Sequence, residues 1–203
     1  MAPRRYGKSS LCEAAFEKSG LPWAKVDFHL AVSEHDAERF IIKGIMELIG
    51  KSISHIDKLA TLITSTVKNL NPKFNLKAGP FVLELEASNK STHAENVYEA
   101  IVLLEKLLVE KDKQAILLFD EFQEVGEIAK GRGIEGAIRS AAQDTQNLVI
   151  VFSGSNPHLI RNMFENDRRP LYKMCKKFVL HRIEQEHYRS HMAHIAKLKW
   201  NKN

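Results

Sequence analysis

The sequence predicts an α/β fold in which helices cover both faces of a mostly parallel sheet. Residues 115–119 and 148–152 are uninterrupted apolar runs, and each run ends in polar side chains. Stretches with apolar residues at helical spacing lie before and between these runs. A strand that is apolar on both faces is typical of a parallel sheet covered on both sides, so these runs are the expected central strands.

The first quarter of the chain predicts two helices and a strand. Apolar residues at helical spacing from Leu11 to Phe16 predict a helix that ends at Gly20. The alternation of residues 24–30 then predicts a strand. Ser33 is the expected N-cap of the long amphipathic helix that follows.

The remaining elements follow from turn residues and periodicity. Residues 53–70 have the pattern of a helix, and the Pro and Gly residues of 71–80 predict a loop. Residues 81–85 alternate like a short strand. Ser91 or Thr92 is expected to begin a helix that leads into the first apolar run. Residues 178–180 are a candidate for one more strand.

Composition and charge narrow the class of protein. The 203 residues suit one domain, or one domain with a small appendage. A composition of 44% hydrophobic and 27% charged residues excludes a disordered chain, collagen and a disulfide scaffold. Cys12 and Cys175 are distant in sequence and no apolar run could cross a bilayer, so we expect a cytoplasmic protein without a membrane span. The net charge of +5 lies in the tail, because residues 173–203 hold eight basic and two acidic side chains. A nearly neutral body disfavours nucleic acid as the main partner.

The first motif that carries chemistry lies at the N-terminus. Residues 2–9 fit the phosphate-loop pattern G-x-x-x-x-G-K-[ST], except that Ala2 replaces the first glycine. Such a loop aims backbone N–H groups at a polyphosphate; Lys8 would reach the terminal phosphates and Ser9 would bind Mg²⁺. The alternative is a basic N-terminal segment that contains Gly-Lys-Ser by chance. The expected nucleotide-binding residues here are Ala2, Pro3, Arg4, Arg5, Tyr6, Gly7, Lys8, Ser9 and Ser10.

A pair of carboxylates follows the first apolar run. Asp120, at the carboxyl end of that strand, would hold Mg²⁺ together with Ser9, and Glu121 would polarise the attacking water as a general base. Open α/β sheets bind ligands at this edge. The alternative is that the two residues simply begin a surface loop.

Polar residues also follow the second apolar run, at 153–156. Ser155 or Asn156 could hydrogen-bond the attacking water or the γ-phosphate at the neighbouring strand end. An ordinary Ser-Gly-Ser-Asn turn is an equally good interpretation.

These motifs resemble the archaeal-type ATPase family in the STAND branch of the AAA+ P-loop superfamily. The resemblance implies the three-layer P-loop NTPase fold, with ATP and Mg²⁺ as cofactors and ATP hydrolysis used as a conformational switch. Lys8 and Glu121 would then be the catalytic residues. Arg168 and Arg169 are similar to a basic pair of the family, and Arg169 could contact the γ-phosphate from a second subunit, although a solvated basic turn is favoured. The stretches that carry the resemblance are Pro3–Leu11, Leu118–Gln123, Gly136–Gln143, Phe152–Ser155, Met163–Phe164 and Arg168–Tyr172.

The sequence departs from the family at both ends. The family has a hydrophobic strand immediately before the phosphate loop, and here only Met1 precedes Ala2. We therefore expect an incomplete ATPase core over residues 1–183, whose sheet lacks the first core strand beside the strand of residues 148–152. Each backbone group left buried and unpaired would cost about 1–3 kcal/mol. A shortened reading frame or a mis-chosen start codon would explain such a truncation.

Residues 184–203 are expected to form a basic amphipathic helix, the start of a truncated lid. Tyr188, Met192 and Ile195 form an apolar stripe, for which packing against the body is favoured over docking on a partner or a membrane surface. Histidines at 187, 191 and 194 share a neighbouring face, but no further zinc ligand is evident.

Three functions therefore remain open. The first is an ATP-hydrolysing switch. The second is a nucleotide-binding or interaction module without effective hydrolysis, which self-associates or binds a partner protein. The weakest is a nucleic-acid remodelling factor, because the basic tail is its only support in the residues.

Overall fold

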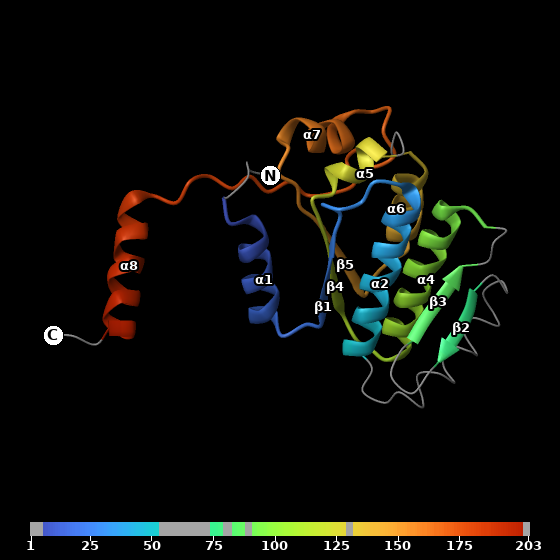
Figure 1. Ribbon diagram of the computed structural model, residues 1–203, viewed down its shortest axis with the longest axis horizontal. Helices are drawn as coiled ribbons and strands as arrows, with labels where there is room; N and C mark the ends of the chain where they lie inside the picture. The colour runs from blue at the N-terminus through green and yellow to red at the C-terminus, as the bar shows by residue number, and fades with distance from the viewer. Residues whose placement is uncertain (1–5, 53–73, 79–82, 88–90, 129–131, 201–203) are drawn as a thin grey trace.

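The computed structural model describes residues 6–52, 74–78, 83–87, 91–128 and 132–200 (Figure 1). The prediction of an α/β fold around a parallel sheet is confirmed. No helix within these ranges is both long enough and apolar enough to cross a membrane.

Three parallel strands form the main sheet. They are β1 (Trp23–Asp27), β4 (Ala115–Asp120) and β5 (Leu148–Phe152), in the order β1-β4-β5. The central strand β4 is buried along its whole length, as its uninterrupted apolar sequence predicts. Asp27 lies opposite Asp120 in the register, so the carboxyl ends of the strands meet at one edge of the sheet. β5 lies at the side of the described sheet, and the expectation that a first core strand is missing beside it stays a prediction.

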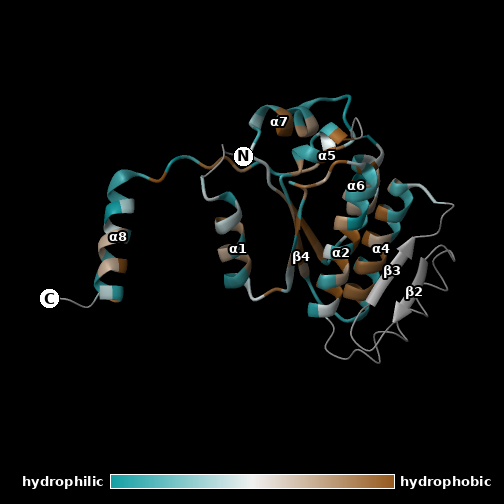
Figure 2. Ribbon diagram, in the orientation of Figure 1, coloured by the Kyte–Doolittle hydropathy of each residue, from teal (hydrophilic) through white to brown (hydrophobic). Residues whose placement is uncertain are grey.

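Helices cover both faces of this sheet. The helices α2 (Glu34–Ser52), α4 (His93–Glu110) and α6 (Arg132–Gln143) pack on one face and supply most of the hydrophobic core. The helix α1 (Lys8–Ser19) packs on the other face, where Phe16 contacts a smaller cluster around Leu118. The short helices α5 (Gln123–Ile128) and α7 (Pro157–Glu165) lie over the carboxyl edge of the strands (Figure 1). Figure 2 shows that the apolar residues gather between the sheet and the α2–α4 layer.

The helix ends follow the expected capping chemistry. Gly20 ends α1 with a φ of 71°, a left-handed conformation that glycine adopts without strain. Ser33 caps α2, because its hydroxyl accepts a hydrogen bond from the Asp36 amide. Thr92 and Glu95 form a reciprocal capping box at the start of α4.

Two expectations about the middle of the chain need correction. β2 (Phe74–Ala78) and β3 (Leu83–Ala87) pair as an antiparallel sheet of their own, with Leu76 opposite Leu85. The expected loop of residues 71–80 therefore contains a strand, and the expected strand of residues 81–85 begins two positions later. Phe74 and Leu76 alternate with polar residues, which is the strand signal that the neighbouring Pro and Gly residues obscured. The helix expected over residues 53–70 lies outside the described residues.

The C-terminal segment differs most from its prediction. Residues 178–180 form no strand, and Phe178 is 69% exposed. The helix α8 (Gln185–Trp200) does form, but it extends away from the body and buries no residue (Figures 1 and 2). The expected packing of its apolar stripe on the body is therefore wrong. Tyr188 and Met192 of the stripe remain about half exposed.

Candidate functional site

The N-terminus of α1 has the backbone conformation that a phosphate loop needs. Gly7 precedes the helix with a φ of 74°, a left-handed conformation that is costly for residues with a Cβ. The N-cap residue Gly7 has no side chain that could cap this helix end, and no acidic residue lies in the first turn. The first N–H groups of a helix have no partner inside the helix, and the helix dipole makes this end positive. The start of α1 therefore has the polarity to hold an anion.

Ser9 and Asp120 come together at this helix end. The Ser9 hydroxyl donates a hydrogen bond of 2.7 Å to the Asp120 Oδ2 atom, across 111 positions of sequence. Asp120 is 5% exposed and ends the central strand β4. A serine hydroxyl and a carboxylate are the hard oxygen donors that Mg²⁺ prefers, so these two residues fit a magnesium site.

Glu121 is held in one orientation beside this pair. Its Oε2 atom accepts hydrogen bonds from the Ser155 hydroxyl and the Gln123 amide, each at 2.6 Å, and from the Ser155 backbone N–H at 3.3 Å. Its backbone φ of 51° is unusual for a residue with a Cβ. Burial acts to raise the pKa of the Glu121 carboxyl, but these hydrogen bonds and the nearby Lys8 ammonium outweigh burial, and the pKa is lowered. Glu121 is therefore ionised at neutral pH.

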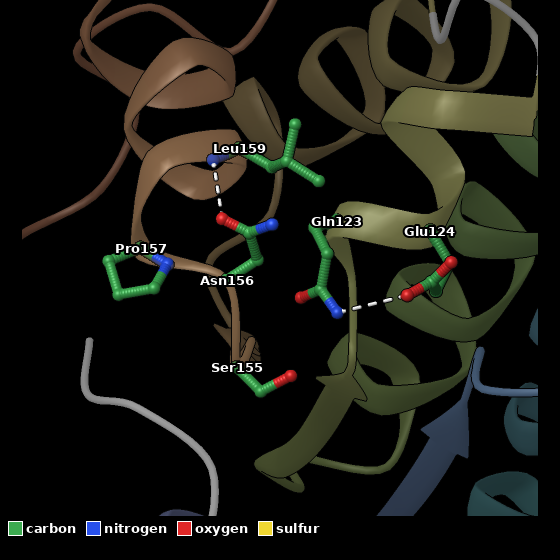
Figure 3. A pocket seen from close by; sticks show the side chains of 6 residues that line it. All are labelled: Gln123, Glu124, Ser155, Asn156, Pro157 and Leu159. Carbon is green, nitrogen blue, oxygen red and sulfur yellow. Dashed lines mark hydrogen bonds between the residues drawn. The ribbon is translucent and has the colours of Figure 1, made fainter.

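A cavity of about 270 Å³ lies next to Glu121, between the starts of α5 and α7. Figure 3 shows Ser155 and Asn156 on one side of it and Gln123 and Glu124 on the other. Gln123 is 2% exposed, and its Oε1 atom is buried without a hydrogen-bond partner among the residues that the structure describes. Two residues that line the cavity, Gln123 and Ser155, therefore also hold the Glu121 carboxylate.

The two polar residues after β5 have different roles in the structure. Ser155 contacts Glu121, which joins the ends of β4 and β5. The Asn156 side chain instead caps α7, because its Oδ1 atom accepts hydrogen bonds from the backbone N–H groups of His158 and Leu159. The turn interpretation therefore holds for Asn156 as a helix cap, and a contact of either residue with a phosphate or water stays a prediction.

Arg169 lies in a buried ion pair, so the favoured interpretation of a solvated basic turn is wrong for this residue. Its Nη2 atom contacts the carboxylate of Glu135, a residue of α6 whose side chain is fully buried. Burial raises the pKa of Glu135 to about 7, and the neighbouring Arg169 charge acts in the opposite direction. Arg168 is exposed.

Several structural contacts come from residues for which the sequence predicted no contact. Arg139 donates hydrogen bonds to the backbone oxygens of Pro170 and Tyr172, at 2.8 and 2.9 Å, and so fixes the segment after α7. Gln123 and Glu135 were also missed as contact residues. Only the position of Gln123, two residues after a strand-end carboxylate, could have indicated a role.

The other predicted residues fall at the margin of the site. Ala2, Pro3, Arg4 and Arg5 lie outside the described residues, and Ser10 lies in the first turn of α1. The Tyr6 hydroxyl accepts a hydrogen bond of 2.9 Å from Arg182, a residue before α8.

Comparison with known proteins identifies the fold. No model of a known protein family matches the chain, and no curated protein matches its sequence. In three dimensions the chain is similar over its whole length to the Walker-type ATPase PABY2304 of Pyrococcus abyssi, with a TM-score of 0.63 and 18% sequence identity. The chain spans 53% of that protein. The similarity at this level of identity shows a shared P-loop NTPase-like fold.

Proposed function

We propose that this protein binds MgATP between the start of α1 and the carboxyl ends of β4 and β5. The observation that carries the proposal is the hydrogen bond between Ser9 and Asp120, which unites the two sequence motifs at one point. The fold shared with a Walker-type ATPase supports the same proposal. A chance Gly-Lys-Ser segment would have no reason to lie against the acidic end of the central strand.

Three side chains would hold the nucleotide. The Lys8 ammonium would contact the terminal phosphates, beside the backbone N–H groups at the start of α1. Ser9 and Asp120 would hold Mg²⁺, which when bound supplies positive charge to the phosphate oxygens. The other loop residues, Ala2 to Tyr6, would complete the phosphate loop.

Glu121 would orient the attacking water. Its Oε2 atom is fixed by Ser155, so the water acceptor at the end of β4 is coupled to the end of β5. A carboxylate with a lowered pKa stays ionised and can accept a hydrogen bond from water throughout the neutral range. Arg169 would have to leave Glu135 before it could contact a phosphate, and we therefore place it outside the catalytic set.

The finer assignment to a STAND or AAA+ switch rests on the resemblance of the motifs. In this proposal, ATP binding and hydrolysis would change how β4 and β5 meet, because Glu121 and Ser155 belong to the two strand ends. Self-association or a partner protein would then respond to this change.

A second candidate function is nucleotide binding without effective hydrolysis. The three hydrogen bonds to one Glu121 oxygen favour it, because they occupy the acceptor that would bind water and they make the carboxylate a weaker base.

MgATP binding and phosphate release by the purified chain test these proposals. We expect Lys8→Ala to abolish binding, while Lys18→Ala, an exposed lysine of the same helix, binds like the native chain. Glu121→Gln should retain binding and lose phosphate release. Undiminished release by Glu121→Gln would refute the role of Glu121, and binding by native chain without release would favour the second candidate.

A further inference from the structure

We propose that His35, Glu38 and His93 form a binding site for a divalent transition metal ion, with Zn²⁺ the best fit. One ligand atom from each of these side chains lies within 4.8 Å of the other two. The His93 Nδ1 atom is in contact with the Glu38 Oε2 atom, and the rings of His35 and His93 are 5.8 Å apart between centroids. This site involves none of the residues proposed to bind nucleotide.

Two helix starts bring these ligands together. His35 and Glu38 are three positions apart in the first turns of α2, so they lie on one face of that helix. His93 is the first residue of α4, whose start is fixed by the capping box of Thr92 and Glu95. Both helix starts lie at the carboxyl edge of the sheet, on the face opposite α1 (Figure 1).

The carboxylate at the centre of the cluster is supported in the way that metal ligands are. Glu38 is 5% exposed, and its second oxygen, Oε1, accepts a hydrogen bond of 2.7 Å from the Asn96 amide. Asn96 is itself oriented by Ser91, whose hydroxyl donates to the Asn96 Oδ1 atom at 2.6 Å. Outer contacts of this kind fix a ligand in one direction and raise metal affinity.

The donor set indicates the class of metal. Two imidazole nitrogens and one carboxylate oxygen suit Zn²⁺, whereas Mg²⁺ and Ca²⁺ prefer oxygen ligands alone. Ligands about 2.1 Å from a tetrahedral zinc lie about 3.4 Å from one another. The direct contact between Glu38 and His93 would therefore have to open to admit the ion, and the side chain of His35 would have to close on it. The exposed side chain of His35 can supply this closure by rotation. Three protein ligands would leave the fourth position for water or an external ligand.

A direct contact between Glu38 and His93 without a metal ion is the competing explanation. It would satisfy the buried carboxylate without any contribution from His35. The two explanations therefore differ in the role of His35, which is exposed and whose removal should not disturb the core.

The test is titration of the chelator-treated full chain with Zn²⁺ and with Co²⁺, whose visible spectrum reports tetrahedral coordination. We expect one ion per chain, a rise in melting temperature with Zn²⁺, and about tenfold or greater loss of affinity in His35→Ala, in His93→Ala and in Asn96→Ala. Glu38→Gln should lose the ion while keeping its hydrogen bond from Asn96, and circular dichroism would verify that each variant folds.

The matched controls are His29→Ala and His187→Ala, which remove exposed histidines outside the cluster. The proposal is overturned if the native chain binds no ion, or if His35→Ala binds as tightly as the native chain, or if the ion is lost in His187→Ala instead.

Discussion

The helices α4 and α8 have similar lengths, 18 and 16 residues, but opposite relations to the rest of the molecule. Nine residues of α4 are buried, and its polar side chains make contacts that are distant in sequence. No residue of α8 is buried, although Tyr188 and Met192 lie on its apolar stripe. Amphipathic periodicity therefore predicted both helices correctly and predicted the packing of only one. Long-range contacts, rather than local pattern, distinguish the body from the C-terminal segment.

The largest effect that this comparison predicts comes from apolar truncation in the body. Phe119 is fully buried and contacts the rings of Phe28, Phe122 and Phe152. We expect Phe119→Ala to lower the free energy of unfolding by about 3–5 kcal/mol, because it leaves a cavity among these rings. Met192→Ala in α8 should change it by less than about 0.5 kcal/mol. Chemical denaturation measures both, and comparable losses would show that α8 packs on the body in solution.

The second prediction concerns a buried polar contact of α4, the one made by the carboxylate of Glu105. Its oxygens accept backbone hydrogen bonds from Gln146, Asn147 and Leu148, at the start of β5. Glu105→Ala would leave these N–H groups without their acceptor, at a cost of about 2–3 kcal/mol. Glu110→Ala, an exposed residue of α4, is the control and should be nearly neutral. Equal effects from the two substitutions would contradict the role assigned to Glu105.

The Glu135–Arg169 pair makes the stability of the body depend on pH. The pKa of Glu135 is raised from 4.5 to about 7, so the folded chain binds this proton more tightly than the unfolded chain does. Its contribution to stability therefore falls as the pH rises through this interval, by up to about 3 kcal/mol. In Glu135→Gln this loss of stability with rising pH should disappear. Glu165→Gln, which alters an exposed glutamate, should retain it. Unfolding free energies at pH 5 and pH 8 provide the check, and an unchanged difference in Glu135→Gln would reject the assignment.

The smallest effect is expected from removal of the C-terminal helix. A chain that ends at residue 183 loses α8, which buries nothing, so its melting temperature should stay within about 2 °C of the native value. Thermal unfolding followed by circular dichroism measures this. A fall of about 10 °C would mean that α8 covers part of the body or of a second copy.

The sequence predicted the structure best where a local pattern is typical of a single element, such as a buried strand or a helix end. The uninterrupted apolar runs predicted β4 and β5, and Gly20 and Thr92 marked helix ends correctly. The Gly-Lys-Ser segment and the Asp-Glu pair were recognised as candidate site residues because their order and spacing are characteristic of phosphate binding.

Contacts between residues that are far apart in sequence and belong to no motif could not be predicted in this way. Glu38 and His93 are 55 positions apart, and each alone is typical of a helix surface. The histidines that attracted attention in the sequence, on α8, are exposed and separate from this cluster. Arg139 lies in a stretch that carries the family resemblance, but its contacts with the backbone of Pro170 and Tyr172 could not be predicted from that stretch.

Equilibrium MgATP binding is the most direct test of the central claim, that the start of α1 and the end of β4 form one nucleotide site. Asp120→Asn keeps an oxygen that can accept the Ser9 hydrogen bond but removes the charge that would hold Mg²⁺. We expect the native chain to bind ATP more tightly with Mg²⁺ than with EDTA, and Asp120→Asn to abolish this difference. Equal Mg²⁺ dependence in the native chain and in a folded Asp120→Asn variant would contradict it.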